Sequence, residues 1–215
     1  MVVLHYTAMG SARAARDWLC TPDAQVSAHY VISRQGTCWH LVEEAARAWH
    51  AGAGAWGAVR DVNSRSIGIE LANTGTEPFA EPQMRALETL LRGILRRWSI
   101  PPARVIGHSD MAPGRKIDPG RRFDWARLAR QGLAEQGLLP QGVMGPRACD
   151  GAWCDLVEAQ DMLRALVRVG YTHDVALPLR LAAFRARHRP TVADDGPATA
   201  RDLAVAEALP PVRGS

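Results

Sequence analysis

The feature that most constrains the fold is a regular apolar stripe between residues 84 and 98. Its apolar residues recur at steps of three and four, which is the spacing of one helix face, and a Pro-Pro pair at 101–102 ends the helix. The stripe consists of Met84, Leu87, Leu90, Leu91, Ile94, Leu95 and Trp98. Residues 66–73 (SIGIELAN) and 104–108 (RVIGH) flank it, and both are typical of strands. This alternation predicts an α/β fold, with a mixed β-sheet flanked by helices.

The segments on either side extend the pattern. Residues 2–7 (VVLHYT) predict a buried strand, and residues 11–19 and 123–133 predict helices. Residues 29–33 and 38–42 flank a Gln-Gly-Thr turn and predict a hairpin. The sequence thus predicts one α/β unit over about the first 136 residues.

The last third of the chain has a different composition. Residues 137–152 are rich in Gly and Pro and predict a linker. Three helical segments follow and predict a small three-helix domain. We therefore expect a first domain at 1–136, a linker at 137–152 and a helical domain at 153–215.

Composition excludes several classes of protein. The net charge is +4, but the arginines are spread along the chain rather than gathered in blocks, which argues against nucleic-acid binding. No run of about 18 apolar residues is present, so we expect no membrane span. No signal peptide is visible either, which predicts a cytoplasmic protein, or a periplasmic one if the true start lies upstream.

The four cysteines lack the CxxC spacing of a thiolate metal site. We interpret them as small buried apolar residues. They are Cys20, Cys38, Cys149 and Cys154.

Two histidines and an aspartate predict a metal site. His5 lies in the first predicted strand, His108 at the end of a later one, and Asp118 on the loop that follows. Pro and Gly residues bend this loop tightly, so that Asp118 can fold back toward His108. Zinc hydrolases hold their metal with three protein ligands and leave a fourth position for water. We therefore expect these three side chains to bind one Zn²⁺ ion.

Glu70 is the candidate acid–base residue. Residues 67, 69 and 71 of its strand are apolar and predict one face, while Glu70 shares the other face with the small residues 68 and 72. This leaves space for a ligand beside the carboxylate; the alternative is a carboxylate paired with an arginine on a solvated face. Lys116 is the one lysine of the chain, and an ammonium near the metal can stabilise an oxyanion. His50 could line the cleft, whereas four histidines are interpreted as packed or surface residues: His29, His40, His173 and His188.

Five segments together resemble the zinc-dependent N-acetylmuramoyl-L-alanine amidases of the type-2 amidase family, whose fold the animal peptidoglycan recognition proteins share. The segments are VVLHYTA, SAHYVISRQGTCWHLV, AWHAG, SIGIELAN and GHSDMAPGRKIDPG, and the resemblance runs from residue 2 to about 135. It implies that His5, His108 and Asp118 hold zinc, that Glu70 is the catalytic glutamate and that Lys116 stabilises the transition state. Candidates for substrate contacts are Tyr30, His50 and Asn73.

The resemblance also implies an activity. We expect hydrolysis of the amide between N-acetylmuramic acid, or its 1,6-anhydro form, and L-alanine, with peptidoglycan or muropeptides as partners. The alternatives are a peptidoglycan binder without activity and a phage-type lysin with the same chemistry. The chain departs from the family at residues 118–122, where DPGRR replaces DPGP, so that Arg121 and Arg122 should add positive charge beside the cleft.

In the last third, AFRARHRP (183–190) is similar to a stretch that a subgroup of the family carries in a domain resembling a peptidoglycan-binding module. Basic residues gather near this stretch, and we expect the helices to position polymeric wall material and to take no part in the chemistry. The alternative is that the helices only pack on the catalytic domain. The basic residues are Arg180, Arg185, Arg187 and Arg189.

Overall fold

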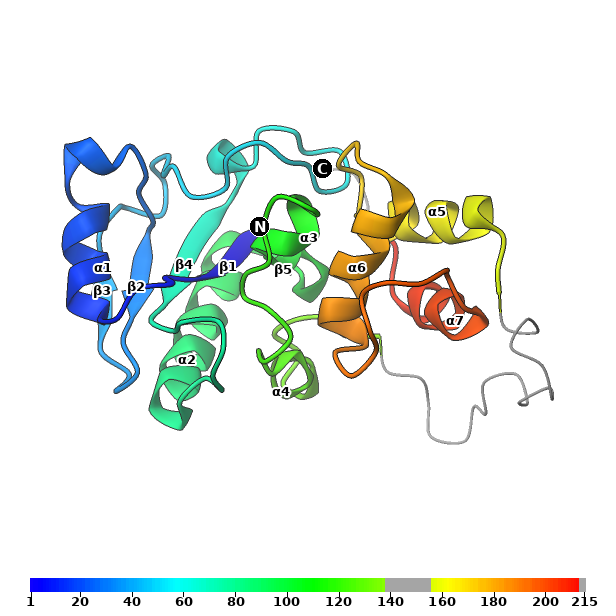
Figure 1. The fold of residues 1–215 in the computed structure, drawn as a ribbon. Coiled ribbons are helices and arrows are strands. Elements are labelled where there is room, and N and C mark those ends of the chain that lie inside the picture. Colours follow the sequence, from blue (N-terminus) through cyan, green and yellow to red (C-terminus); the bar gives the residue numbers. More distant parts are fainter. Residues whose placement is uncertain (138–155, 213–215) are drawn as a thin grey trace.

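A five-stranded mixed β-sheet forms the centre of the molecule, with helices on both faces (Figure 1). The computed structural model describes residues 1–137 and 156–212. The strands are β1 (Val2–Tyr6), β2 (Tyr30–Ile32), β3 (Cys38–His40), β4 (Ile67–Leu71) and β5 (Val105–Gly107), in the order β3-β2-β4-β1-β5. Strand β1 runs parallel to β4 and β5, β2 runs parallel to β4, and only the β2–β3 hairpin is antiparallel. The predicted fold class is confirmed.

The predicted elements form close to where the patterns place them. The helices are α1 (Ala12–Leu19), α2 (Glu81–Trp98), α3 (His108–Met111), α4 (Trp125–Arg130), α5 (Ala159–Arg168), α6 (Leu177–His188) and α7 (Ala200–Ala208). Helix α2 contains the whole apolar stripe and begins three residues before it, with a proline in its first turn. The exception is His108, which begins α3 instead of ending a strand.

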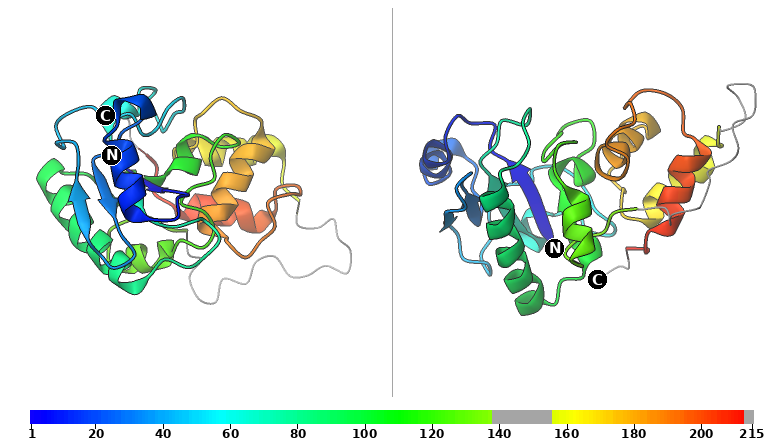
Figure 2. Two further views of the ribbon diagram at one scale, coloured as in Figure 1. Left: turned by 60° about the vertical axis from the view of Figure 1, so that its left-hand side comes forward. Right: turned by 90° about the horizontal axis from the view of Figure 1, so that it is seen from below.

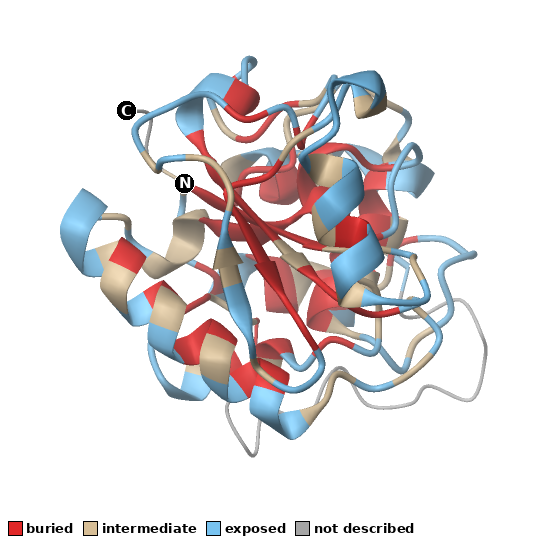
Figure 3. Ribbon diagram, turned by 90° about the vertical axis from the view of Figure 1, so that its left-hand side faces the viewer, coloured by how far each residue is buried: buried red, intermediate tan, exposed pale blue. Residues whose placement is uncertain are grey.

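The faces of the sheet follow the alternation of each strand. Ile67, Ile69 and Leu71 of β4 are buried in one core with α2 and α4, together with Val2 and Leu4 of β1. His5 of β1 and Glu70 of β4 are register partners in the sheet. Each follows a residue of the core just described, so both side chains point to the opposite face. The predicted faces of β4 are therefore confirmed, and Figure 3 shows the buried strands between their covering layers.

The C-terminal helices pack directly on this opposite face. Helix α6 contacts α3, and a second core joins sheet residues such as Val3 and Ile106 to Leu166 and Phe184 of the C-terminal helices. Figure 2 shows α5, α6 and α7 beside the sheet unit. The expected linker lies, apart from residue 137, outside the described residues, so the linker and the division into two domains stay predictions.

The arginines near AFRARHRP do not form an exposed basic patch. Arg185 and Arg189 both pair with the buried carboxylate of Asp202 on α7, and Arg187 pairs with a buried aspartate of α3. The guanidinium of Arg180 donates to backbone carbonyls. These four side chains therefore have partners within the protein, as buried charges need, while the expectation that the helices position wall material stays a prediction.

Two further expectations can be compared with the structure. Cys20 and Cys38 are exposed free thiols, so the interpretation as buried residues is wrong for both. Cys38 lies on the edge strand β3, which packs against a neighbour on one side only. Cys149 and Cys154 fall outside the described residues. Among the helices that are described, none is long and apolar enough to cross a membrane.

Candidate active site and metal centre

A cleft of about 610 Å³ opens at the carboxyl ends of β1 and β4. Carboxyl ends of parallel strands commonly carry functional residues, because the loops that follow them surround one space. All five residues expected to carry the chemistry line this cleft: His5, Glu70, His108, Lys116 and Asp118.

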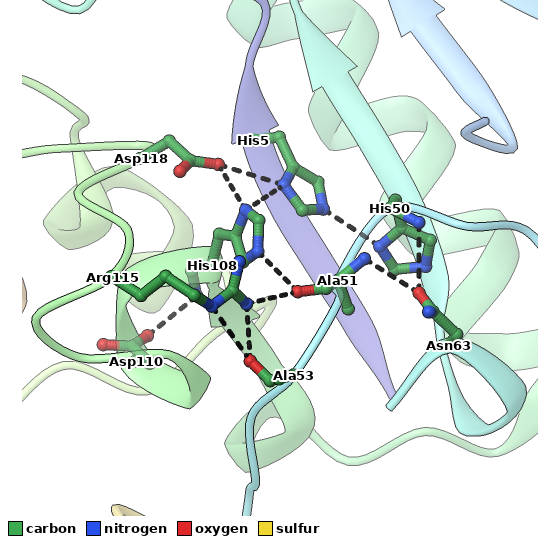
Figure 4. Close-up of polar contacts among 10 residues, drawn as sticks. His5, His50, Ala51, Ala53, Asn63, His108, Asp110, Arg115 and Asp118 are labelled. Atoms are coloured by element: carbon green, nitrogen blue, oxygen red, sulfur yellow. Dashed lines mark hydrogen bonds and ion pairs between the residues drawn. The ribbon is translucent and has the colours of Figure 1, made fainter. Parts of the chain in front are cut away.

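The three expected metal ligands converge on one point (Figure 4). The Nδ1 atoms of His5 and His108 lie 2.9 Å apart, and each lies 3.0 Å from Oδ2 of Asp118. All three residues are at most 8% exposed. The atoms thus form a nearly equilateral triangle on the floor of the cleft.

The backbone fixes the tautomer of His108. Its Nε2 lies 2.8 Å from the carbonyl oxygen of Ala51. A carbonyl oxygen only accepts, so the hydrogen of the neutral ring sits on Nε2. The lone pair of Nδ1 therefore points into the triangle.

A longer chain of hydrogen bonds fixes the tautomer of His5. The hydroxyl of Ser66 donates to the carbonyl of Val62 over 2.5 Å, so its oxygen accepts from Nε2 of His50, 3.3 Å away. Nδ1 of His50 then has no hydrogen and accepts from Nε2 of His5 over 3.0 Å. Nδ1 of His5 is left with its lone pair facing the triangle, as in His108.

The triangle therefore brings together three acceptors without a hydrogen between them. Such an arrangement is repulsive unless a cation lies among them. A tetrahedral metal ion with bonds of ~2.0–2.1 Å needs ligand atoms about 3.3–3.4 Å apart, so the triangle would have to open by only a few tenths of an ångström. Two imidazole nitrogens and a carboxylate oxygen suit a divalent metal ion, and these residues fit one.

Glu70 lies beside this triangle in an unusual electrostatic position. Its Oε2 atom is buried and has no hydrogen-bond partner among the described residues. Burial, and then the negative charge of Asp118, raise the pKa of Glu70 to about 8, while the positive charge of Lys116 opposes the rise. The charges that act on Glu70 are thus those of the cleft, and the alternative of a carboxylate paired with an arginine on a solvated face is wrong. A carboxyl group with a pKa near neutrality is suited to take and return a proton.

Lys116 is held over the cleft by its loop. Its backbone N–H donates to the carbonyl of Ala112, and Gly114 adopts a φ of +79°, which favours glycine. The neighbouring Arg115 ties the loop down by donating to the carbonyls of Ala51 and Ala53. Lys116 is itself exposed and lines the cleft, so that its ammonium can meet negative charge that develops on a substrate.

Two of the three expected substrate contacts lie away from the cleft, and the third lines it. The hydroxyl of Tyr30 donates to Glu44 over 2.7 Å, and the amide of Asn73 donates to the carbonyls of Glu77 and Pro78; neither residue lines the cleft. His50 does line it, but His5 and Ser66 occupy both of its ring nitrogens. The contact orients His5, and a substrate contact of His50 stays a prediction.

The sequence contained one overlooked signal for this role of His50. Gly68 lies in the middle of β4, and a Cβ atom there would come within 2.4 Å of the His50 ring. A glycine inside a strand often marks the close approach of another group. The space that was expected to hold a ligand beside Glu70 is therefore filled on this side by His50.

Arg121 does not add charge to the cleft as expected. Its guanidinium pairs with Asp194 and donates to the carbonyl of Pro190, both in the segment after α6. It thus joins the loop of Asp118 to the C-terminal helices.

Comparisons with known proteins identify the family of the chain. The family described as N-acetylmuramoyl-L-alanine amidase matches residues 1–121. The N-acetylmuramoyl-L-alanine amidase AmiD of Escherichia coli is 34% identical over 247 residues, which cover 97% of this chain and 81% of that protein. The 1,6-anhydro-N-acetylmuramyl-L-alanine amidase AmpD of Haemophilus influenzae is 40% identical over 104 residues, covering 48% of this chain and 56% of that protein.

Solved structures extend the similarity to the C-terminal helices. AmiD of E. coli, in complex with the substrate anhydro-N-acetylmuramic acid-L-Ala-D-γ-Glu-L-Lys, matches with a TM-score of 0.84 at 34% identity, over 97% of this chain and 87% of that one. AmpDh3 of Pseudomonas aeruginosa, in complex with an anhydromuramic pentapeptide, matches with a TM-score of 0.79 at 29% identity. The match covers 97% of this chain and 90% of that one. The family, the fold and the arrangement of the sequence motifs therefore agree, and this chain belongs to the N-acetylmuramoyl-L-alanine amidase family.

Proposed function

We propose that the chain is a zinc-dependent amidase that hydrolyses the bond between N-acetylmuramic acid, or its 1,6-anhydro form, and L-alanine. The observation that carries the proposal is the triangle formed by Nδ1 of His5, Nδ1 of His108 and Oδ2 of Asp118, next to Glu70, whose buried Oε2 has no hydrogen-bond partner among the described residues. His5, His108 and Asp118 would hold the zinc ion. Zinc in such a site supplies a Lewis acid that polarises a carbonyl and a means of making water nucleophilic near neutral pH.

The other residues of the cleft supply the proton transfers and the remaining charge stabilisation. Glu70 takes the proton of the attacking water and later returns it to the amine of L-alanine as the amide bond breaks. Lys116 stabilises the negative charge that develops on the carbonyl oxygen of that amide. Both roles need the side chains to face the same cleft as the ligands, which they do.

The nature of the substrate is supported from two sides. Two related structures contain anhydromuramyl peptides. In this chain, Trp18 and Trp49 line the cleft with 49% and 58% of their surface exposed, and exposed apolar surface in a cleft is typical of a ligand-binding groove. We therefore propose soluble anhydro-muropeptides as the main substrates and turnover or recycling of cell-wall fragments as the role.

The direct test is incubation of the purified chain with anhydro-N-acetylmuramic acid-L-Ala-D-γ-Glu-L-Lys. Mass spectrometry should detect the free tripeptide and the free sugar, and the reaction should stop with a chelator and resume when zinc is added. His108→Ala is the control, because it removes one corner of the triangle and should lose both zinc and activity. A chain that binds zinc and the muropeptide without releasing the tripeptide would be a binder and would contradict the proposal.

Intact peptidoglycan provides the second arm of the test. Release of peptides from insoluble wall at a rate matching the soluble substrate would favour the lysin-type role over recycling. Cleavage confined to the soluble anhydro-muropeptide would support the role proposed here.

A further inference from the structure

Asp110 is a buried node behind the metal triangle. It lies on α3, two residues after His108, and is 1% exposed. Its Oδ2 accepts from the backbone N–H of Gly107 over 2.7 Å. The same carboxylate accepts from Tyr171 over 2.7 Å through Oδ1 and from Arg187 over 2.6 Å through Oδ2. Both of these donors come from the C-terminal helical part of the chain.

Arg187 reaches further into the catalytic part than this one ion pair. It lies on α6, and its Nη2 donates to the carbonyls of Val105 on β5 and Glu135. Its guanidinium also stacks over the ring of Trp125 on α4 at 4.1 Å. With only 4% of its surface exposed, Arg187 joins β5, α3 and α4 at one point.

This point lies directly behind two of the three metal ligands. Gly107 immediately precedes His108, and a Cβ atom on it would come within 2.7 Å of Pro119, the residue after Asp118. The N–H of Ser109 donates to the carbonyl of Asp118 over 2.9 Å. A shift of the Gly107–Asp110 turn would therefore move His108 and Asp118 with respect to His5.

We propose that Arg187 and Tyr171 are positioning residues that act through Asp110 to hold His108 and Asp118 in metal-binding geometry. The C-terminal helices then complete the metal centre of the enzyme, whatever they do with the cell wall. The inference rests on the proposed metal site. Groups that orient metal ligands typically change metal affinity by ~10–100-fold when removed, and Arg187 acts one step further away, so we expect about 10-fold.

The chain offers a matched control on the same helix. Arg185 is also a buried arginine of α6, at 2% exposed, and it pairs with the fully buried Asp202 over 2.7 Å. Its partners all lie within the C-terminal part, at Asp202 and at carbonyls of residues 193–197. Arg185→Met and Arg187→Met thus each remove one buried arginine–aspartate pair of α6, and only the pair of Arg187 involves α3, which carries His108.

The experiment measures zinc affinity of the full-length variants by competition with a chromophoric chelator, together with urea unfolding. Arg187→Met should bind zinc about 10-fold more weakly than the wild type, and its cobalt-substituted form should show an altered visible spectrum. Arg185→Met should lower the urea midpoint but keep the wild-type zinc affinity and cobalt spectrum. The inference would be overturned if the two variants had the same zinc affinity, whether that affinity is the wild-type value or is reduced in both.

Tyr171→Phe decides the matter if Arg187→Met does not fold. It removes one hydroxyl from Asp110 and should weaken zinc binding several-fold, whereas Tyr30→Phe, which removes a hydroxyl bonded to Glu44 outside the cleft, should not. Wild-type affinity in Tyr171→Phe would overturn the inference while leaving the proposed function intact. A wild-type chain that binds no zinc would instead overturn the metal site itself, and the inference with it.

Discussion

Replacing Glu70 by glutamine should stabilise the metal-free protein, and by an amount that depends on pH. Glutamine has the shape of glutamate but does not ionise. The pKa of Glu70 is raised from 4.5 to about 8 in the folded chain, so between these values the folded state keeps a proton that the unfolded state has lost. The free energy of unfolding of the wild type therefore falls as the pH rises through this window. In Glu70→Gln the fall that residue 70 causes is absent, because glutamine does not ionise.

The size of the effect follows from the same pKa. One pKa unit corresponds to about 1.4 kcal/mol, so the rise to about 8 corresponds to at most ~5 kcal/mol of lost stability above pH 8. Because water reaches the cleft, we expect a measured difference of about 2–3 kcal/mol at pH 9 and almost none at pH 4.5. Bound zinc should narrow the difference, since a nearby cation favours the carboxylate.

Urea unfolding of both proteins with a chelator, at pH values from 3 to 9, is the assay. Glu88→Gln is the matched control, because hydrogen bonding to Arg127 lowers the pKa of Glu88. That substitution should destabilise the protein near neutral pH, with a difference that shrinks as the pH falls through the lowered pKa. A Glu70→Gln difference that is constant with pH, or a wild type that is the more stable protein at pH 9, would refute the reasoning.

Three other substitutions test the rest of the site. Gly68→Ala places a methyl group against the His50 ring and should cost ~1–3 kcal/mol in urea unfolding; unchanged stability would contradict the close packing. Ser66→Ala removes the acceptor that fixes the tautomer of His50 and should weaken zinc binding up to ~10-fold in chelator competition; an unchanged affinity would contradict the tautomer assignment. Lys116→Ala should keep its zinc but lose ~10²-fold in kcat, and a variant with wild-type kcat would remove Lys116 from the mechanism.

Much of the fold and the centre of the site could be predicted from local patterns. In α2 and β4 the spacing of the apolar residues matches the spacing of the buried side chains. The type of element, and the face that it buries, can therefore be inferred from the local sequence alone. His5 and Glu70 belong to strands of this kind, and the structure brings them into one cleft with His108.

The parts that could not be predicted depend on contacts across the chain. The role of His50 depends on Ser66 and on the space above Gly68, and no local pattern relates these positions. The arginines of α6 show their charge in the sequence, but whether a charge faces water or a buried partner depends on which helix lies opposite. Cys38 is exposed because its strand lies at the edge of the sheet, and the local sequence does not show where in the sheet a strand lies.

The order of the strands also bears on how the enzyme is made. Strand β1 precedes the other four strands in the sequence, yet its two neighbours are β4 and β5, whose residues begin at Ile67 and Val105. His5 and His108 are 103 positions apart, so the ribosome must add all of these residues after His5 before the two histidines can meet. Pairing between strands far apart in the sequence is slow, because closing the long loop costs conformational entropy before the stabilising contacts form. The proposed ligands therefore come together only after β1 has paired with β4 and β5, and a metal ion bound as proposed would enter the site after this pairing.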